Sequence, residues 1–469
     1  MIIDKQLNLK KMKTKNILFG IFICLMSVTG YAQDLKSSYF MKSDNLRHDL
    51  NPAFMGESGY VSFPVLGNVN VGTQGNVGLN DFLYKTNDAS SQYKLTTFLS
   101  PTVSSDDFMG KIKKKNRINA NVGLTLFSFG ATTKRGYNTF QLKVKSSTQT
   151  ILPYELFDFM KNGTSNKEYD LKNLSARSRS YAELSVGHAR HINKRLDIGI
   201  KLKALVGIAN AEAKFDQLQV TLSDDQWQVH SRGTLNVNLG GSSFRKDKKE
   251  GWVNGINVDK AGVAGWGGAI DLGATYKVID GLTASAALLD LGMMKWTTML
   301  KASSDETFTF DGFSNIPVKD DGKENSISNQ WTGIRDDLKK LGHFYEDKTV
   351  SSSHAEMLNA TLNLGAEYVL PSYKKLSFGI LSSTQFAGKY TSTLAMLSAN
   401  VRPIKLIEAS LNCNYSTYGT SFGGMLSIHP RFFTFFIGTD CFVAKVTPQY
   451  VPVRSANVNC CIGLNFAIY

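Results

Sequence analysis

Few residues of this chain have the types and spacing that enzymatic chemistry requires. The stretch Gly419–Gly423 matches the G-x-S-x-G pattern, in which a nucleophilic serine occupies a sharp turn between a strand and a helix. Here apolar residues go on alternating with small and polar ones through Leu426 and Ile428, so Ser421 is expected on a strand. A motif without its structural context is weak evidence for a site. The sequence therefore predicts no catalytic residue, and a protein that is not an enzyme.

Metal ligands and cofactor motifs are equally sparse. His188 and His191 are three residues apart, so on a strand they point to opposite faces and cannot share a metal ion. One acidic loop could contact calcium, but it lacks the spacing of a calcium loop, and a solvated loop is the favoured interpretation. Its residues are Asp320, Asp321, Glu324 and Asn325. We predict no metal site and no cofactor.

The cysteines have no spacing typical of metal binding. Cys441 and Cys460 flank the connection 444–456 on two strands expected to be neighbours, so a disulfide between them is geometrically conceivable in an oxidising compartment. Unpaired thiols, buried or facing lipid, are the default interpretation for these residues and for Cys413 and Cys461.

Long alternating strands are the elements that must position these side chains. Leu196–Ile208 carries Leu, Ile, Ala and Val on one face and mainly Asp, Lys and Gly on the other. Strands of soluble proteins usually have about 5–6 residues, whereas a tilted strand that crosses a bilayer needs about 9–11. The same alternation recurs from Val61 to Val458–Tyr469. The mean hydropathy of −0.17 excludes a helical membrane protein but suits a barrel, whose two faces cancel. We therefore predict an all-β fold, an antiparallel transmembrane β-barrel.

Long and short connections alternate along the expected barrel. Outer-membrane barrels have long extracellular loops and short periplasmic turns. Counting the strands gives sixteen, or fourteen when the weak hairpin 218–239 is left out. The long connections are 80–116, 146–180, 240–261, 291–356 and 444–456, and the tight ones are 131–135, 193–195, 279–281, 370–374, 402–404 and 429–430.

The N-terminus has the features of a secretory signal peptide. Basic residues from Lys10 to Lys15 precede the apolar stretch Ile17–Val28, which is too short to span a membrane. The small residues Gly30 and Ala32 then stand at −3 and −1, so we expect cleavage after Ala32 and a mature chain that starts at Gln33. This export signal predicts a protein of the cell outer membrane in a Gram-negative bacterium.

The chain is basic, with a formal net charge of +14. Nucleic acid is not expected as a partner of an exported chain. Lipopolysaccharide phosphates at the outer rim of a barrel are the better candidate, and outer-membrane lipid surrounds it. The clearest basic run is either a solvated flank of a loop or a contact for lipopolysaccharide, and it comprises Lys111, Lys113, Lys114 and Lys115.

A short phrase before the first strand carries a family resemblance. Asn51, Pro52 and Ala53 stand just upstream of Val61, and this Asn-Pro-Ala resembles the segment that FadL-like outer-membrane barrels carry between a lumen-plugging N-terminal region and strand one. The longer phrase Leu50–Gly56 looks like a Bacteroidetes outer-membrane barrel family with a domain of unknown function, and is more distantly similar to barrels associated with type IX secretion. The resemblance implies a FadL-like barrel of about fourteen strands.

These observations together divide the chain into a signal peptide (1–32), an N-terminal plug segment with the Asn-Pro-Ala (33–58) and a barrel (59–469). The plug candidates are Asn51, Pro52 and Ala53. We predict insertion by the barrel-assembly machinery and passive transport of a small-molecule ligand, hydrophobic molecules included. The alternative is an accessory or structural barrel of an envelope secretion or motility system.

Overall fold

A computed structural model describes residues 35–63, 68–85, 95–163, 167–223, 226–297, 299–311, 332–334, 336–337, 340–347, 353–442 and 457–468 of the protein. The expected signal peptide, the acidic loop around Asp320, the connection 444–456 and Tyr469 lie outside these residues.

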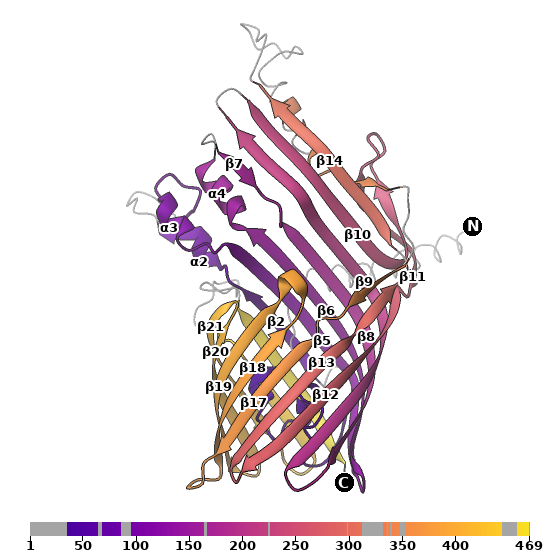
Figure 1. Cartoon of the computed structure of the whole chain (residues 1–469), viewed down its shortest axis with the longest axis vertical. Coiled ribbons are helices and arrows are strands. Elements are labelled where there is room, and N and C mark those ends of the chain that lie inside the picture. The colour runs from indigo at the N-terminus through magenta and orange to yellow at the C-terminus, as the bar shows by residue number, and fades with distance from the viewer. Residues whose placement is uncertain are drawn as a thin grey trace, which may run out of the picture.

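Fourteen antiparallel strands close into a barrel (Figure 1). β23 closes the ring by pairing with β1 and β2, which both pair with β5 and so form two halves of one interrupted strand. The predicted fold class is thereby confirmed. Around the ring lie β1 (Gly59–Ser62) with β2 (Asn68–Gly75), β5 (Lys115–Thr133), β6 (Gly136–Pro153), β8 (Ser175–His191), β9 (Leu196–Leu222), β12 (Gly265–Ile279), β13 (Leu282–Trp296), β17 (Thr361–Val369), β18 (Leu376–Gln385), β19 (Ser392–Ile404), β20 (Ile407–Ser416), β21 (Gly419–Ile428), β22 (Phe433–Thr439) and β23 (Val458–Ile468).

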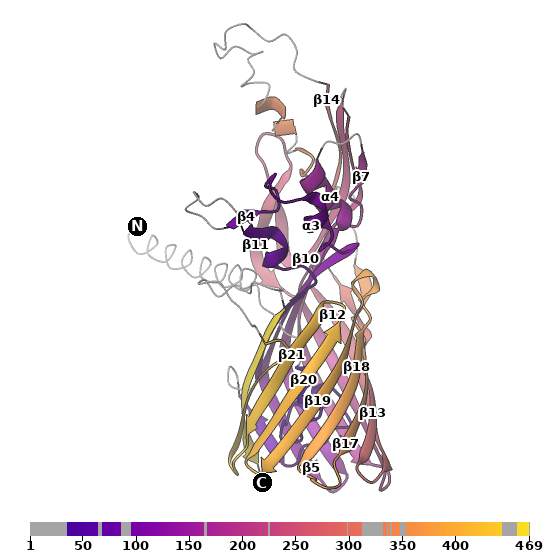
Figure 2. The same ribbon diagram turned by 90° about the vertical axis from the view of Figure 1, so that its left-hand side faces the viewer.

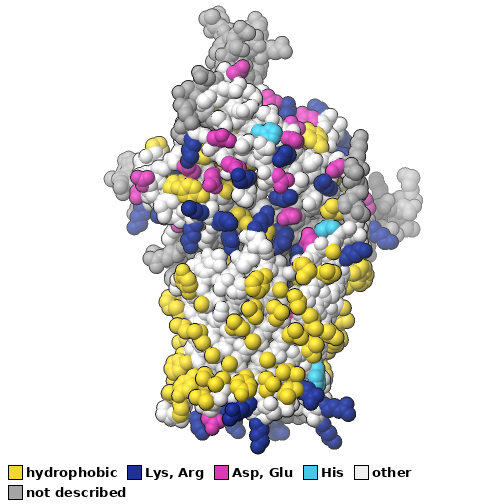
Figure 3. Space-filling view, in the orientation of Figure 1, with side chains coloured by type: hydrophobic (Ala, Val, Ile, Leu, Met, Phe, Trp, Pro, Cys, Tyr) yellow, Lys and Arg dark blue, Asp and Glu magenta, His cyan; other side chains and the backbone are white. Residues whose placement is uncertain are grey.

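The alternation of each strand sorts its side chains between the two faces of the barrel. In β9, Ile198, Ile200 and Leu202 are 40% to 54% exposed on the outer face, whereas Lys201 and Lys203 on the inner face are 1% and 8% exposed. Figure 3 shows the outward apolar side chains as a band around the lower barrel, with Lys and Arg gathered at the end that carries the tight turns. The outer face is therefore apolar over the height that a bilayer would cover.

Strand β9 is longer than the barrel wall and changes its partner. From Leu196 to Gly207 it pairs with β12, and from Ala209 onward it pairs with β10 (Trp227–Lys246). β10 also pairs with β14 (Leu300–Phe310) and β11 (Val253–Gly262), and these strands extend beyond the ring (Figures 1 and 2). The hairpin 218–239 therefore belongs to this extension, and a count of sixteen barrel strands is too high.

Long connections that the sequence assigns to loops contain strands. β11 lies within 240–261 apart from its last residue, and β14 lies within 291–356. Periodicity does not reveal these two strands, because neither has a run of outward apolar residues that would mark it as membrane-crossing. Shorter strands at the same end are β7 (Glu168–Asp170), β15 (Tyr345–Glu346) and β16 (His354–Met357). The long connections thus build a folded head above the barrel.

Short helices complete this head. They are α2 (Leu79–Phe82), α3 (Ser105–Met109) and α4 (Tyr154–Asn162), with the hairpin of β3 (Leu83–Lys85) and β4 (Leu95–Thr97) beside them and the turn η3 (Gly388–Tyr390) between β18 and β19. Phe98 and Phe108 stack with their ring centroids 4.3 Å apart, and Phe157 packs into the same cluster. Ser104 accepts a hydrogen bond from the backbone N–H of Asp107 and so caps α3. No helix in the described part of the chain is long and apolar enough to cross a membrane.

Candidate functional site

Residues 35–58, here called the N-terminal segment, contact strands around much of the ring, from β6 through β13 and β17 to β20. The hydroxyl groups of Tyr39 and Ser285 on β13 lie 3.0 Å apart. Asn363 on β17 donates to the carbonyl of Leu50 over 2.9 Å. The segment includes two short turns, η1 (Lys36–Ser38) and η2 (Arg47–Asp49), and most of its side chains are buried. Contacts with strands all around a ring can be made only from its inner face.

Two carboxylates of the barrel bind the backbone of this segment. Asp440, just after β22, accepts hydrogen bonds of 2.9 Å from the N–H groups of residues 36 and 37. Glu408 on β20 accepts from the N–H groups of residues 42 and 43 over 3.0 Å and 2.7 Å. These bonds satisfy buried backbone donors that have no partner in a regular helix or sheet. The segment is therefore tied to the wall by polar contacts.

The Asn-Pro-Ala sits where the barrel wall has no side chains. A methyl group at Gly199 on β9 would come within 2.1 Å of the carbonyl oxygen of Pro52, and one at Gly273 on β12 within 2.1 Å of Oδ1 of Asn51. The same Asn51 oxygen accepts from the N–H of Ala53 over 2.9 Å, which fixes the local turn. Only glycine permits this close approach of two backbones.

Asp49 lies at the centre of a buried ion-pair cluster. Its carboxylate bonds Lys143 on β6 and lies 2.6 Å from Nζ of Lys201 on β9. Nζ of Lys201 is also 3.0 Å from Nδ1 of His48, whose other ring nitrogen is 2.7 Å from the hydroxyl of Tyr60. The side chains of Lys143 and Lys201 are 5% and 1% exposed, so Asp49 supplies the negative charge that both need.

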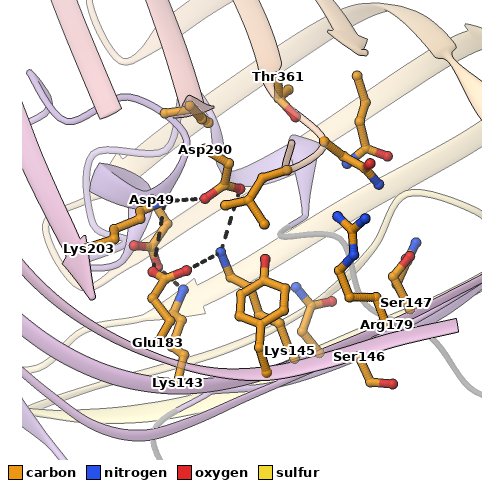
Figure 4. Close-up of a pocket in the computed structure, with 18 of the residues that line it drawn as sticks. Asp49, Lys143, Lys145, Ser146, Ser147, Arg179, Glu183, Lys203, Asp290 and Thr361 are labelled. Carbon is orange, nitrogen blue, oxygen red and sulfur yellow. Dashed lines mark hydrogen bonds and ion pairs between the residues drawn. The ribbon is translucent and has the colours of Figure 1, made fainter. Parts of the chain in front are cut away.

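A second ion-pair network lies beside the first and belongs wholly to the wall (Figure 4). Nζ of Lys203 lies 2.5 Å from Asp290 and 2.7 Å from Asp271. Lys145 lies 2.8 Å from Glu183, which is 2% exposed. Figure 4 shows Lys145, Glu183, Lys203 and Asp290 pointing toward one another, and they come from β6, β8, β9 and β13. Together the two networks contain four lysines and four carboxylates and carry no net charge.

A β-bulge turns Asp290 inward. The register of β12 with β13 shifts between Ile270 and Leu272, so two residues of β13, Leu289 and Asp290, lie opposite one residue of β12. Asp290 has a φ of 55°, in the left-handed region that Asp tolerates better than most residues, and its N–H donates to Asp271 over 2.7 Å. Without the bulge, the strict alternation of β13 would direct Asp290 outward.

These networks border a cavity of about 120 Å³ inside the barrel, above the N-terminal segment. Its wall also contains Arg177 and Arg179 of β8, two residues apart on the inner face. Figure 4 shows Arg179 extending into this space apart from the lysine–carboxylate network. The remaining wall is largely Asn, Ser, Thr and Gln. The lining therefore offers hydrogen-bonding and ion-pairing groups rather than an apolar surface.

The residues that resembled a catalytic motif are not assembled into a site. Ser421 lies on β21, as expected, and its hydroxyl donates to the carbonyl of Asp440 over 3.0 Å. His188 and His191 hydrogen-bond separate partners, Asn138 at 2.8 Å and Asp197 at 2.5 Å. Among the described residues no group of three or more His, Cys, Asp and Glu side chains could hold a metal ion.

The four cysteines of the described barrel are free thiols, so the conceivable bridge between Cys441 and Cys460 is absent. Cys441 is buried while Cys460 is exposed on the outer face of β23, and the two side chains therefore diverge. The basic run lies at the head side, between α3 and β5, with all four lysines exposed. Nζ of Lys111 lies 4.1 Å over the ring of Tyr84. The four residues are Lys111, Lys113, Lys114 and Lys115.

Sequence reasoning places Lys201 and Lys203 on the polar face of β9 but does not single out the charged residues of the cavity as a site, although a signal for them exists. Lys143 and Lys145 alternate with Leu142 and Val144 on β6, and Lys201 and Lys203 do the same on β9. Two charges on consecutive inward positions of a strand whose other face is apolar indicate a charged lumen. Their carboxylate partners, however, are scattered over the chain, and no spacing connects them.

Comparison with known proteins gives one family and several structural likenesses. No curated protein matches the chain significantly. The toluene transporter TbuX of Ralstonia pickettii is similar in structure, with a TM-score of 0.44 at 12% identity over 95% of this chain and 100% of that one. The toluene transporter TodX of P. putida has a TM-score of 0.40 at 9% identity, over 90% of this chain and 93% of that one. The CymD monoaromatic hydrocarbon channel has a TM-score of 0.40 at 9% identity, over 94% of each chain. Residues 52–440 match the sequence family described as "Family of unknown function (DUF5723)", and this protein belongs to that family.

Proposed function

We propose that this protein is an outer-membrane barrel through which a small molecule crosses passively. The observation that carries the proposal is the polar cavity inside an apolar-coated ring, bounded toward the tight turns by the N-terminal segment. A barrel that served only as a scaffold has no need for a hydrated space lined with ionised groups, since burying charge is costly. A solute path gives that space a use.

In this proposal the N-terminal segment is a plug. Its polar contacts with the wall are hydrogen bonds and ion pairs, of which the cluster around Asp49 and the backbone bonds to Asp440 and Glu408 are the clearest. Apolar side chains of the segment also pack against the wall, in two buried clusters. Polar contacts of this kind exchange with water more readily than a packed apolar core. The Asn-Pro-Ala, seated against Gly199 and Gly273, is the part of the plug nearest the first barrel strand and serves as its anchor.

The proposed orientation follows from the two ends of the barrel. The folded head faces the cell exterior and the tight turns face the periplasm, as in other outer-membrane barrels. The chain reaches this site after removal of residues 1–32 and insertion by the barrel-assembly machinery. At the head side, the exposed lysines 111 and 113–115 contact lipopolysaccharide phosphates. Ser421 is held within a strand, and we assign the protein no enzymatic activity.

Single-channel conductance in a planar bilayer tests the proposal. Deleting Leu35–Arg47 removes the backbone bonds of the plug to Asp440 and Glu408 and should raise the conductance clearly above that of the full mature chain. A variant that lacks residues 313–325, an equal length from the longest connection, is the matched control and should conduct like the full chain. Equal, measurable conductance of all three proteins would refute the assignment of the segment as a plug. Absence of conductance from all three would overturn transport and favour an accessory barrel of an envelope secretion or motility system.

A further inference from the structure

The wall of the internal cavity carries more positive than negative charge. Six basic side chains border it, against the three carboxylates of Asp49, Glu183 and Asp290. The lysines at positions 143, 145, 201 and 203 are matched by Asp49, Glu183, Asp271 and Asp290 within the two ion-pair networks. The other basic side chains of the lining are Lys36 of the N-terminal segment and the two arginines of β8, of which Arg179 pairs with Glu356.

Arg177 makes its described hydrogen bonds to neutral groups. Its Nη2 donates to Oε1 of Gln149 over 2.8 Å and to Oδ1 of Asn359 over 3.2 Å. Its guanidinium carbon lies 4.9 Å from the ring centroid of Tyr390. No ion pair of Arg177 occurs within the part of the chain that the structure describes. Neutral acceptors orient a guanidinium without forming an ion pair with it, and a guanidinium has five N–H donors.

Arg179 is 6% exposed and incompletely bonded. Its Nη2 bonds the carboxylate of Glu356, and its Nη1 donates to the carbonyl of Met357 over 3.3 Å. Its Nε is buried and has no hydrogen-bond partner. Glu356 also accepts from His354 at 3.1 Å, so its charge is shared. A buried donor without a partner is costly, and its presence beside a cavity indicates a place for an acceptor.

We propose that the cavity takes small hydrophilic anions and that Arg177 and Arg179 bind their carboxylate or phosphate oxygens. This inference rests on the proposed transport function and specifies the cargo of the same site. An anion would accept charge-assisted hydrogen bonds from the remaining N–H donors of both guanidinium groups, and such bonds are stronger than neutral ones. A neutral apolar solute would instead remove water from these charges without replacing it. Cations are repelled by the same two residues.

Charge selectivity in a planar bilayer is the direct test. With the full mature chain between solutions of unequal KCl concentration, the zero-current potential should give a chloride-to-potassium permeability ratio above one. The double variant Arg177→Gln, Arg179→Gln should lower that permeability ratio severalfold, toward one. Arg177→Lys with Arg179→Lys keeps the charge and should keep much of the selectivity. Arg245→Gln, at an exposed arginine of β10 outside the barrel wall, is the matched control and should have no effect.

Two anionic probes separate the chemistry of the cargo. Inorganic phosphate and succinate, added at millimolar concentration, should each reduce the chloride current if the arginines bind phosphate and carboxylate oxygens alike, and a response to one alone assigns the site to that group. A conducting barrel with a ratio of one or below, unchanged in the double variant, overturns the anion site and leaves transport standing. If neither the full chain nor the Leu35–Arg47 deletion conducts, transport fails. Calorimetric titration of the solubilised full chain with phosphate and with succinate then decides the anion site, since absence of heat for both overturns it.

Discussion

Replacing Asp49 by Asn should release the N-terminal segment from the barrel. The change removes one carboxylate from two ammonium groups, those of Lys143 and Lys201, that are at most 5% exposed. Breaking a buried ion pair by removing one partner costs about 3–5 kcal/mol, because the other charge stays buried without compensation. Since about 1.4 kcal/mol is a factor of ten, the equilibrium between bound and released segment should shift by roughly 10²–10⁴.

Hydrogen exchange of the full mature chain in lipid nanodiscs measures this shift. Backbone N–H groups bound by Asp440 and Glu408 exchange only when the segment leaves the wall, so their exchange should accelerate by the same factor. Asp280→Asn, at a carboxylate that is 98% exposed in a turn, is the control and should leave exchange unchanged. Combining Asp49→Asn with methionine at both lysines leaves no buried charge unpaired and should restore part of the protection. Wild-type exchange rates in Asp49→Asn alone would refute the conclusion that the Asp49 ion pairs hold the segment to the wall.

Three further predictions address the wall, the segment and the head. Arginine at Ile200, which is 40% exposed on the apolar face, should cost about 2–4 kcal/mol of folding free energy in lipid vesicles, whereas Ile200→Val should cost little. Burial raises the pKa of Asp44, in the N-terminal segment, from its usual 3.8 to about 6. Asp44 thus holds its proton more tightly in the bound segment than in the released one, and segment binding should weaken as pH rises from about 4 through 6. The segment should therefore be better protected from protease at pH 5 than at pH 8, and in Asp44→Asn this protection should not depend on pH. Glutamine at Lys113–Lys115 should lower the affinity for lipopolysaccharide in a salt-dependent manner without changing barrel stability.

The barrel wall could be predicted from the sequence because a wall strand follows one simple rule. Each strand between lipid and lumen must alternate, and β9 does so from Leu196 to Ile208. The Asn-Pro-Ala is indicated by a family resemblance, and the sequence also contains the glycines that make room for it, since a side chain at Gly199 or Gly273 would collide with it. One sequence shows those glycines without showing what approaches them.

The head and the bulge could not be predicted, for different physical reasons. β10 pairs with β14 although the barrel strands β12 and β13 lie between them in the sequence, and nothing local in either segment specifies that non-local pairing. The bulge at Asp290 depends on a single residue accepting a left-handed conformation in exchange for ion pairs with Lys203 and a hydrogen bond to Asp271. Periodicity describes a regular strand, and it fails where a tertiary contact outweighs regularity.

The distribution of charge within the barrel links the segment to the cargo. The carboxylates of the second network stay in the wall, but Asp49 belongs to the segment. When the segment leaves, Lys143 and Lys201 lose their partner, and the positive charge that β8 already supplies through Arg177 and Arg179 increases. An anion that enters the cavity can take the place of Asp49, so anion binding and segment release should favour each other, as linkage requires. We therefore expect phosphate to accelerate exchange of the segment in the wild type, and to do so much less when both lysines are methionine. Slower exchange with phosphate would mean that the anion stabilises the closed barrel instead.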